Sequence, residues 1–358
     1  NTHMRLYEFK IKPEQLKLQK KELIQKIQSI GTDSESVAVI DRITQLLNDV
    51  GVGGRVQSLL SRVEQIDDND VQRAVKKIAK MVSTVDFDSQ GREKLFKLWN
   101  ADKIVNKKVL TSGGVHKMSD IFVGYGKNPA MTELVDDFND VIAQGIGPGE
   151  FTLAVLSKGI SGIGAGAGSG DLIIDGSPVE LKAKRVKNAR FTDRNVSVSS
   201  QYPGLVDKFL KKYAKDIQAL EQQGLKMRSN QGMNLAQLAK LVQTSRKKQI
   251  LNDVTAVLSN VFPGVKGVER ITNALVKDSD SARLLYGKMN IQYYLATKRA
   301  KGDLKGILFI DLGQKTYTFA KNVSDLTKSG LSLDVNTAYP LATTDPANNP
   351  YPQIGLLS

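Results

Sequence analysis

Three side chains that can carry hydrolytic chemistry lie close together in the sequence: Asp171, Glu180 and Lys182. We expect two short strands here, at 171–174 and 179–183, because both runs are apolar and an Asp-Gly pair, a strong tight-turn signal, lies between them. Alternate residues of a strand project from the same face, so Glu180 and Lys182 should share a face. A tight turn also brings the start of the first strand beside the end of the second. The spacing therefore predicts that Asp171 lies next to the other two side chains.

Two carboxylates and an ammonium group in one place suit the hydrolysis of phosphodiesters. Carboxylate oxygens are ligands that Mg²⁺ prefers, and the bound metal activates a water molecule and neutralises the charge that develops on the phosphate oxygens. The lysine can orient or deprotonate that water. The alternative is an exposed hairpin face on which the same residues form an ordinary salt bridge.

The pattern resembles the PD-(D/E)xK nuclease superfamily, which includes restriction endonucleases and many phage nucleases. In that family an Asp begins the second core strand, a Glu-x-Lys lies on the third, and a Glu often comes from the preceding helix. The resemblance matches Asp171 to the Asp, Glu180-Leu181-Lys182 to the Glu-x-Lys, and Glu150 to the helix Glu. It implies that Glu150, Asp171 and Glu180 hold Mg²⁺, with Mn²⁺ able to substitute, and that Lys182 orients or deprotonates the attacking water.

The resemblance covers less than a third of the chain. It implies a first core strand within 160–169 and, later in the chain, a closing helix at 291–298 and a closing strand at 306–312. The chain departs from the family at Gly170, which stands where the family has a proline. Alternating glycines make 160–169 a poor strand by propensity, so a loop beside the DNA is the alternative there.

The glycine-rich run also fits a loose dinucleotide-binding fingerprint, beginning at Gly162. That fingerprint must follow a strand and open a helix, whereas this run follows an expected helix and precedes an expected strand. The chain also lacks the Gly-Lys-Ser/Thr of a nucleotide-triphosphate loop. We therefore expect no nucleotide cofactor.

The amino-acid composition excludes several kinds of catalytic and metal-binding site. The 358 residues include no cysteine and two histidines, His3 and His116, so thiolate chemistry, Cys-based zinc sites and multi-histidine metal centres are excluded. Hydrolysis would have to rest on carboxylates, lysine and a hard cation.

The chain is basic, with 51 Lys and Arg against 37 Asp and Glu, which predicts attraction to nucleic acid or an acidic membrane surface. The window 182–248 holds sixteen of the basic residues and four of the acidic ones, and it begins at the Glu-x-Lys. For a single lysine a solvated helix face is the simpler interpretation, but the cluster favours contact with DNA phosphates. The predicted contacts are Lys184, Arg185, Lys187, Arg190, Arg194, Lys208, Lys211 and Lys212.

Apolar periodicity predicts the organisation of the chain. We expect a helical N-terminal region at 4–144, a nuclease core at 145–330 with a helical insertion at about 205–289, and a tail at 331–358. The tail has no Lys or Arg and four of the ten prolines, which favours an extended segment laid across the surface. The expected strands and helices place the fold in the α/β class, and the resemblance implies an α+β mixed sheet with a restriction-endonuclease-like core.

The leading hypothesis is a Mg²⁺-dependent endodeoxyribonuclease, possibly phage-encoded. One alternative is a non-catalytic DNA-binding or phage structural protein on a decayed nuclease core, and another is a protein-interaction scaffold. We expect a cytoplasmic protein, or one in the host cytoplasm if it is encoded by a phage, because no membrane span or signal peptide is found. The sequence leaves homo-oligomerisation, strand-cutting mode and the choice of DNA over RNA open.

Overall fold

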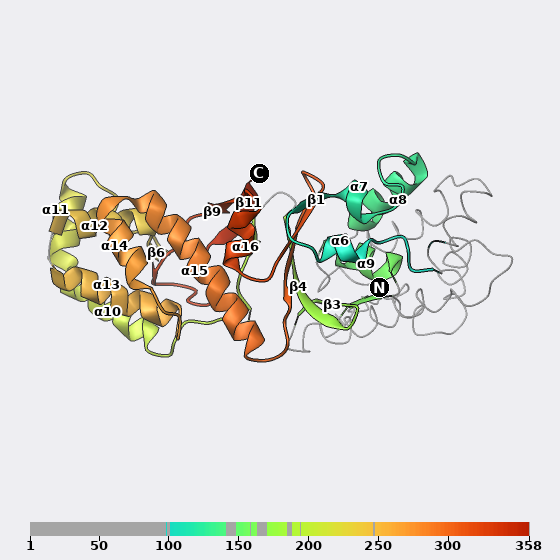
Figure 1. Ribbon diagram of the computed structural model, residues 1–358. Coiled ribbons are helices and arrows are strands. Elements are labelled where there is room, and N and C mark those ends of the chain that lie inside the picture. Colours follow the sequence, from blue (N-terminus) through green and yellow to red (C-terminus); the bar gives the residue numbers. More distant parts are fainter. Residues whose placement is uncertain are drawn as a thin grey trace, which may run out of the picture. The chain divides into compact units, whose positions relative to one another are not determined.

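The computed structural model describes residues 98, 101–140, 148–157, 159–162, 170–184, 188–193, 195–245 and 248–357. The chain divides into two compact units (Figure 1). The first comprises 1–183 and 303–319, and the second comprises 184–302 and 320–358. The expected mixed α/β class is confirmed. The helices expected before residue 98 lie outside the described residues.

The first unit is built on a six-stranded sheet with the order β1-β8-β7-β4-β3-β2. Strands β2, β3 and β4 follow one another in the chain and pair antiparallel, and β1 pairs antiparallel with β8. The bounds are β1 Val115–Lys117, β2 Ile160–Gly162, β3 Leu172–Ile174, β4 Ser177–Lys184, β7 Gly306–Asp311 and β8 Thr316–Ala320.

The β3–β4 hairpin forms as predicted. Its two turn residues, Asp175 and Gly176, have φ angles of 46° and 77°. A two-residue hairpin turn with both residues in the left-handed region matches the twist of the flanking strands, which is why Asp-Gly is favoured there. The turn fixes the register, in which Ile174 pairs with Ser177 and Leu172 with Val179.

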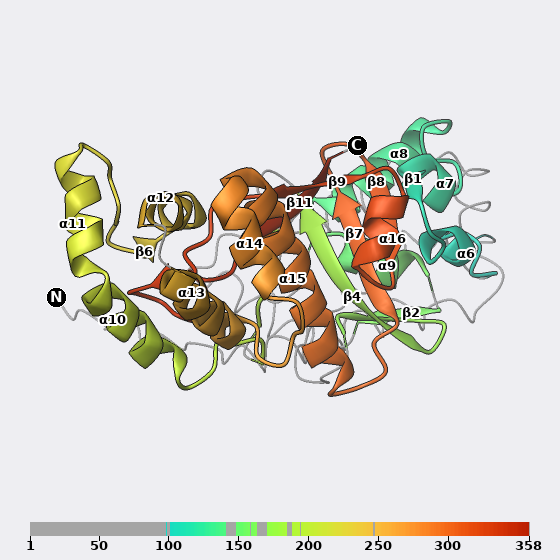
Figure 2. The ribbon, with the colours of Figure 1, turned by 60° about the vertical axis from the view of Figure 1, so that its left-hand side comes forward.

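Strand β7 joins the other edge of β4. The backbone N–H of Lys305, just before β7, donates to the carbonyl of Pro178 near the start of β4 at 2.9 Å. The starts of the two strands therefore lie together, so the strands run parallel, as their arrows show in Figure 2. A parallel pair needs a long crossover connection. The helical insertion expected between the third and fourth core strands is this connection.

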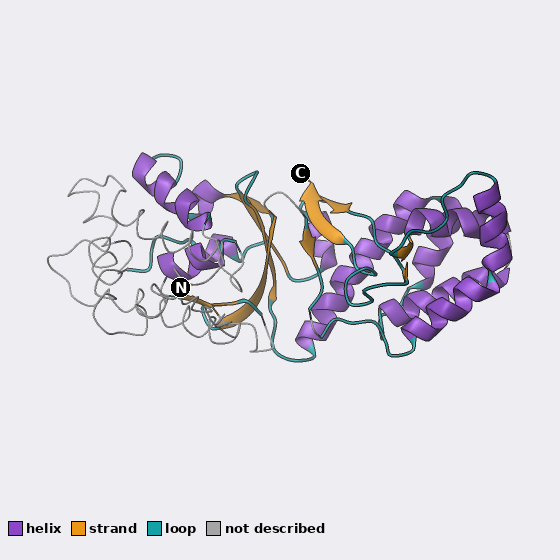
Figure 3. Ribbon diagram, turned by 180° about the vertical axis from the view of Figure 1, so that it is seen from behind, coloured by secondary structure: helices purple, strands orange, loops and turns teal. Residues whose placement is uncertain are grey.

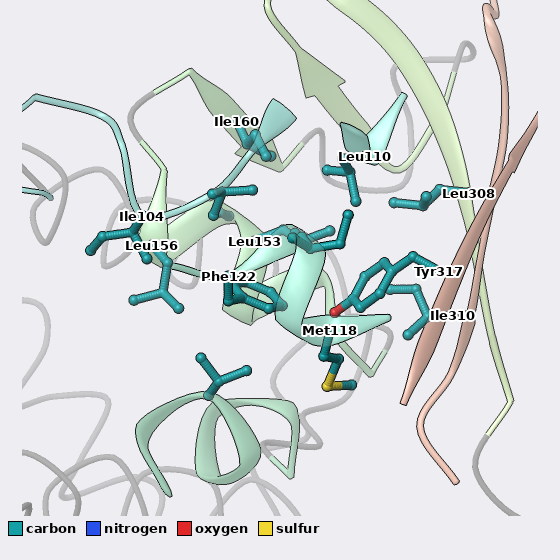
Figure 4. Close-up of a cluster of buried hydrophobic side chains, with 14 of the residues drawn as sticks. Ile104, Leu110, Met118, Phe122, Leu153, Leu156, Ile160, Leu308, Ile310 and Tyr317 are labelled. Atoms are coloured by element: carbon teal, nitrogen blue, oxygen red, sulfur yellow. The ribbon is translucent and has the colours of Figure 1, made fainter. Parts of the chain in front are cut away.

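Within its described residues, the first unit has four helices beside the sheet: α6 Lys107–Leu110, α7 Met118–Ile121, α8 Pro129–Asn139 and α9 Glu150–Leu156. Their apolar side chains meet those of one sheet face in a single buried cluster, in which Leu153 lies near Tyr317 and Ile310 (Figure 4). Residues 101–140 were expected to belong to a separate helical region. Instead they pack on this core, and β1 extends its sheet, because Val115–Lys117 pairs with the edge of β8.

The second unit contains six helices of eight or more residues between β4 and β7 (Figure 3). The last of them is a continuous 21-residue helix, so the segment 291–298 is its C-terminal part. We expected that segment to close the nuclease core, but it falls in the second unit, where α15 packs against α12, α14 and β9. The helices are α10 Tyr202–Lys212, α11 Ala214–Gln222, α12 Leu235–Ser245, α13 Lys248–Val261, α14 Glu269–Lys277 and α15 Ser279–Arg299.

The tail after residue 330 is an integral part of the second unit. It is extended, as predicted, but it does not lie on the surface, because Tyr351 and Ile354 are at most 1% exposed. Tyrosine hydroxyls hold its backbone: Tyr202 donates to the carbonyl of Pro340 and Tyr286 to that of Pro350. The short elements here are β5 Ala189–Arg190, β6 Gly232–Met233, α16 Val323–Lys328, β9 Ser332–Val335, β10 Leu341–Ala342 and β11 Gln353–Leu357. Strand β11 pairs with β5 and β9, and β10 pairs with β6.

Candidate active site

Asp171 and Glu180 lie close together at the open end of the β3–β4 hairpin. The last pair of the hairpin is Leu172 with Val179; Asp171 immediately precedes Leu172, and Glu180 immediately follows Val179. The backbone N–H of Asp171 donates to the carbonyl of Val179 at 3.1 Å. Its carboxylate Oδ2 accepts the backbone N–H of Leu181 at 3.0 Å, so the Asp171 side chain is itself hydrogen-bonded to the backbone of β4.

Lys182 completes the cluster. Its Nζ lies 2.7 Å from Oε1 of Glu180, two residues earlier on the same strand face, as the alternation of β4 predicts. Glu180 is 1% exposed, and the side chain of Lys182 is 15% exposed. The alternative of a solvent-exposed strand face with an ordinary salt bridge therefore does not hold.

The opposite side chains of β4 explain why this arrangement is stable. Val179 and Leu181 point into the apolar cluster that the helices of the first unit cover, together with Leu172 and Ile174 of β3. Strand alternation then directs Asp171, Glu180 and Lys182 to the other face of the sheet. Burial of the apolar face fixes the hairpin register, because a slip of one residue would exchange the two faces.

The proximity of the two carboxyl groups alters the pKa of Asp171. Burial raises this pKa, and the charge of Glu180 raises it further, to about 6 from an ordinary 3.8. The charge of Lys182 and the N–H of Leu181 act in the opposite direction without cancelling the rise. Like charges held close together are unfavourable, and groups whose pKa is perturbed in this way gather at functional sites.

Gly170 allows the close approach of Asp171 to β4. A Cβ atom at position 170 would lie 2.8 Å from the carbonyl oxygen of Val179 and 2.9 Å from its carbonyl carbon. Both atoms belong to backbone, which cannot move aside without disturbing the strand. Any side chain at this position, including that of the proline in the family pattern, would push the chain away from β4.

Glu150 begins α9, which follows the left-handed Gly149 and packs with the apolar cluster on the covered face of the sheet. A Cβ on Gly149 would lie 2.7 Å from Cδ1 of Ile310, so the start of α9 lies against β7. Within the described residues, no group of three or more histidine, aspartate and glutamate side chains is arranged to hold a metal ion. The predicted three-carboxylate set is therefore not assembled in this structure, although two of its members meet.

Asp171 and Glu180 nevertheless fit a hard divalent cation. Their donors are carboxylate oxygens, which Mg²⁺ and Mn²⁺ accept. Their closeness, with Glu180 buried, has an electrostatic cost that a bound cation would offset, because the cation replaces repulsion with attraction.

An ion network that sequence reasoning missed holds the other end of the hairpin. Nζ of Lys107 lies 2.6 Å from Asp102 and 2.7 Å from Asp175 of the turn. The hydroxyl of Ser157 donates to the second oxygen of Asp102 at 2.7 Å. Burial lowers the pKa of Lys107, but its two carboxylate partners outweigh this and raise it overall. These residues lie up to 73 positions apart, so no local pattern could have identified the network.

The predicted phosphate contacts have several different environments. Arg190 was expected to bind DNA, but its guanidinium donates to the backbone carbonyls of Asn348 and Tyr351, which holds the tail. Lys212 pairs with Asp253 at 2.5 Å and lies over the ring of Tyr213, so it too serves packing within the second unit.

The remaining predicted contacts are compatible with an exposed basic surface or lie outside the described residues. Lys208 is exposed on α10, and Lys211 is exposed in an ion pair with Asp207 at 2.7 Å. Lys184 is half-buried at the end of β4. Arg185, Lys187 and Arg194 lie outside the described residues.

Comparisons with known proteins returned no matching family model, no matching curated protein and no matching solved structure. In the part of the chain that the structure describes, no helix combines the length and apolar character needed to cross a bilayer.

Proposed function

We propose that this protein is a Mg²⁺-dependent endodeoxyribonuclease whose active site is formed by Asp171, Glu180 and Lys182. The observation that carries the proposal is the closeness of the half-buried carboxyl group of Asp171 to the buried one of Glu180, which also binds a lysine ammonium group at 2.7 Å. A protein that needed only a stable hairpin would gain from apolar residues at these positions. The buried charge is best explained by chemistry that requires it.

Asp171 and Glu180 would hold the cation, which supplies activation of a water molecule and neutralisation of the phosphate charge. The ammonium group of Lys182 is held against Glu180, where it can orient the attacking water or the scissile phosphate by donating hydrogen bonds. Asp171 holds a proton below about pH 6 and must lose it before its carboxylate can act as a ligand. Activity should therefore require a pH above this value.

The order of elements supports the resemblance to PD-(D/E)xK nucleases. Helix α9 precedes three successive antiparallel strands, the candidate Asp precedes the second, and the Glu-x-Lys lies on the third. A later strand, β7, then adds to the edge of the third. The short β2, Ile160–Gly162, occupies the position of the first core strand.

A DNA-binding protein on a nuclease core that no longer cuts is the second candidate function. It is favoured by one observation, the failure of Glu150 to complete a three-carboxylate group in the described residues. This candidate predicts salt-sensitive DNA binding without metal-dependent cleavage.

Cleavage of supercoiled plasmid in Mg²⁺ or Mn²⁺ tests the proposal. Asp171→Ala and Lys182→Ala should each lower the cleavage rate on the order of 10²-fold or more, because each removes a group in contact with the reacting centre. The matched controls are Asp303→Asn and Lys305→Ala, whose residues are exposed beside the start of β7. The controls should cut like wild type. Equal cutting by Asp171→Ala and wild type, or no cutting by wild type in either metal, would overturn the proposal.

A further inference from the structure

The net charge of the chain is segregated between its two units. The first unit has 26 Lys and Arg and 26 Asp and Glu, so its formal charge is zero. The second unit has 25 Lys and Arg against 11 Asp and Glu, which accounts for the entire +14 of the chain. The candidate active site therefore lies in a neutral unit, and the attraction to a polyanion belongs to the other unit.

Helices α10 and α11 of the second unit present an exposed row of lysines. Lys208, Lys211 and Lys215 are all exposed and follow one another at spacings of three and four residues. Lys208 and Lys211 lie about one turn apart on α10, and Lys215 lies near the start of α11, so the two helices together offer cations to more than one phosphate of a nucleic-acid strand. The acidic neighbour Asp207 pairs with Lys211 on this surface. Because both partners of that pair are more than 60% exposed, it contributes little, and a phosphate can replace the carboxylate.

The opposite, apolar face of these two helices is buried against the rest of the second unit. Most of their large apolar residues pack into the second unit and are at most 3% exposed, whereas Leu205 and Leu210 are half-buried; the buried residues are Tyr202, Val206, Phe209, Tyr213, Ile217 and Leu220. None of the large apolar side chains that stand exposed in the described part of the chain lies on α10 or α11. An amphipathic helix that binds a bilayer inserts its apolar face, and here that face is already occupied. The chemistry of the surface therefore favours nucleic acid over a membrane.

We infer that the second unit binds the phosphate backbone of duplex DNA through the surface formed by Lys208, Lys211 and Lys215, and thereby supplies the substrate affinity that the neutral first unit lacks. The binding step stands without the proposed nuclease activity, whereas the division of labour between the units rests on it. Phosphate contacts carry no base information, so this surface should bind duplexes of different sequence equally well.

Binding of a labelled 30-base-pair duplex to the full-length protein in EDTA, over a range of salt concentrations, tests this inference without cleavage. The variant Lys208→Gln/Lys211→Gln/Lys215→Gln should weaken binding at least tenfold at low salt. It should also reduce the slope of log affinity against log salt by about one for each lysine. The arginine version of the same triple variant should retain binding, because it keeps the charge.

The matched control is Lys103→Gln/Lys108→Gln/Lys127→Gln, which removes three exposed charges from the first unit. It should bind the duplex within about twofold of wild type, because it leaves Lys208, Lys211 and Lys215 in place. Equal losses in both triple variants would overturn the inference, as would no loss in either. Loss of binding to phosphatidylglycerol vesicles with intact duplex binding would assign the surface to a membrane instead. Duplex binding through this surface without plasmid cleavage in metal would overturn the proposed nuclease alone.

Discussion

Asp171 is hydrogen-bonded to both residues that flank Glu180: its backbone N–H donates to the carbonyl of Val179, and its carboxylate accepts the backbone N–H of Leu181. This proximity has an electrostatic cost, because burial and the charge of Glu180 both disfavour the ionised form of Asp171. Sites that retain such a cost commonly need it for function, and relief of that cost by substitution or by a cation can be measured.

Replacement of Asp171 by the isosteric amide should stabilise the protein while abolishing cleavage. At pH 8 the ionised Asp171 is disfavoured by about 2 pKa units, which corresponds to about 3 kcal/mol at most. We therefore expect Asp171→Asn to raise the free energy of unfolding by about 1–3 kcal/mol at pH 8, seen as a higher thermal midpoint. Asp303→Asn is the exposed control and should leave the midpoint unchanged. A lower midpoint for Asp171→Asn would contradict the assigned repulsion.

The same pKa determines how stability depends on pH. Because the folded pKa of Asp171 lies above its unfolded value, the folded state binds the proton more tightly. The stabilising effect of that proton is complete below about pH 4 and is lost as the pH rises through about 6. The thermal midpoint of wild type relative to Asp171→Asn should therefore fall between pH 4 and pH 7. A constant difference over this range would show that Asp171 does not titrate there.

A divalent cation should stabilise the protein only where Asp171 is ionised. Ligand binding to the folded state raises stability by RT ln(1 + [L]/Kd), and protons compete for the carboxylate. At concentrations of Mn²⁺ well above its Kd, the thermal midpoint should rise at pH 8 and stay nearly constant at pH 5. Glu180→Gln should lose the rise at pH 8. Glu150→Gln should retain it if Asp171 and Glu180 hold the cation, and loss of the rise would add Glu150 to the ligands.

Gly170→Ala should impair the site more than the fold. The added Cβ would contact the backbone of Val179 at 2.8–2.9 Å, which must push Asp171 away from Glu180. We expect a fall in kcat with little change in KM, together with a shift of the acidic limb of the pH profile towards lower pH. Gly204→Ala is the control, because position 204 is exposed in α10 with open space around it. An unchanged pH profile in Gly170→Ala would assign this glycine to folding alone.

Lys107 should matter for stability through the hairpin turn. Its replacement by alanine leaves the carboxylates of Asp102 and Asp175 without their shared cation, and Asp102 is mostly shielded from water. We expect a loss of about 1–3 kcal/mol in the free energy of unfolding, measured by denaturant titration. The exposed neighbour Lys108→Ala should cost less than about 0.5 kcal/mol. Similar effects of the two substitutions would show that the ion network of Lys107 does not stabilise the hairpin.

Arg190 should act on the second unit and leave DNA affinity intact. Its guanidinium donates to the carbonyls of Asn348 and Tyr351, so Arg190→Ala should loosen the tail from β5. Hydrogen exchange in residues 345–357 should become faster, while binding of the 30-base-pair duplex changes less than threefold. A large loss of binding with unchanged exchange would restore Arg190 to the phosphate contacts predicted from the sequence.

The sequence by itself determined the local features of this protein. The Asp-Gly turn requires left-handed backbone, and the apolar runs on either side require one buried face, so hairpin, register and side-chain direction all follow from short stretches of chain. The meeting of Asp171, Glu180 and Lys182 was predictable for this reason. The helices of the insertion were also predictable, because their apolar residues recur at helical spacing.

Only the tertiary structure decided which parts of the chain belong together. Lys107 and Arg190 look alike in the sequence, yet Lys107 contacts Asp175, 68 residues away, and Arg190 contacts Asn348, 158 residues away. Tyrosine hydroxyls of distant helices donate hydrogen bonds to backbone carbonyls of the tail, which holds the tail in the second unit. The 291–298 segment joins the second unit because it continues a long helix packed there. The zero net charge of the first unit became visible only when the two units were known. Non-local contacts of this kind leave no periodicity in the sequence, since the chain between the partners is free to vary.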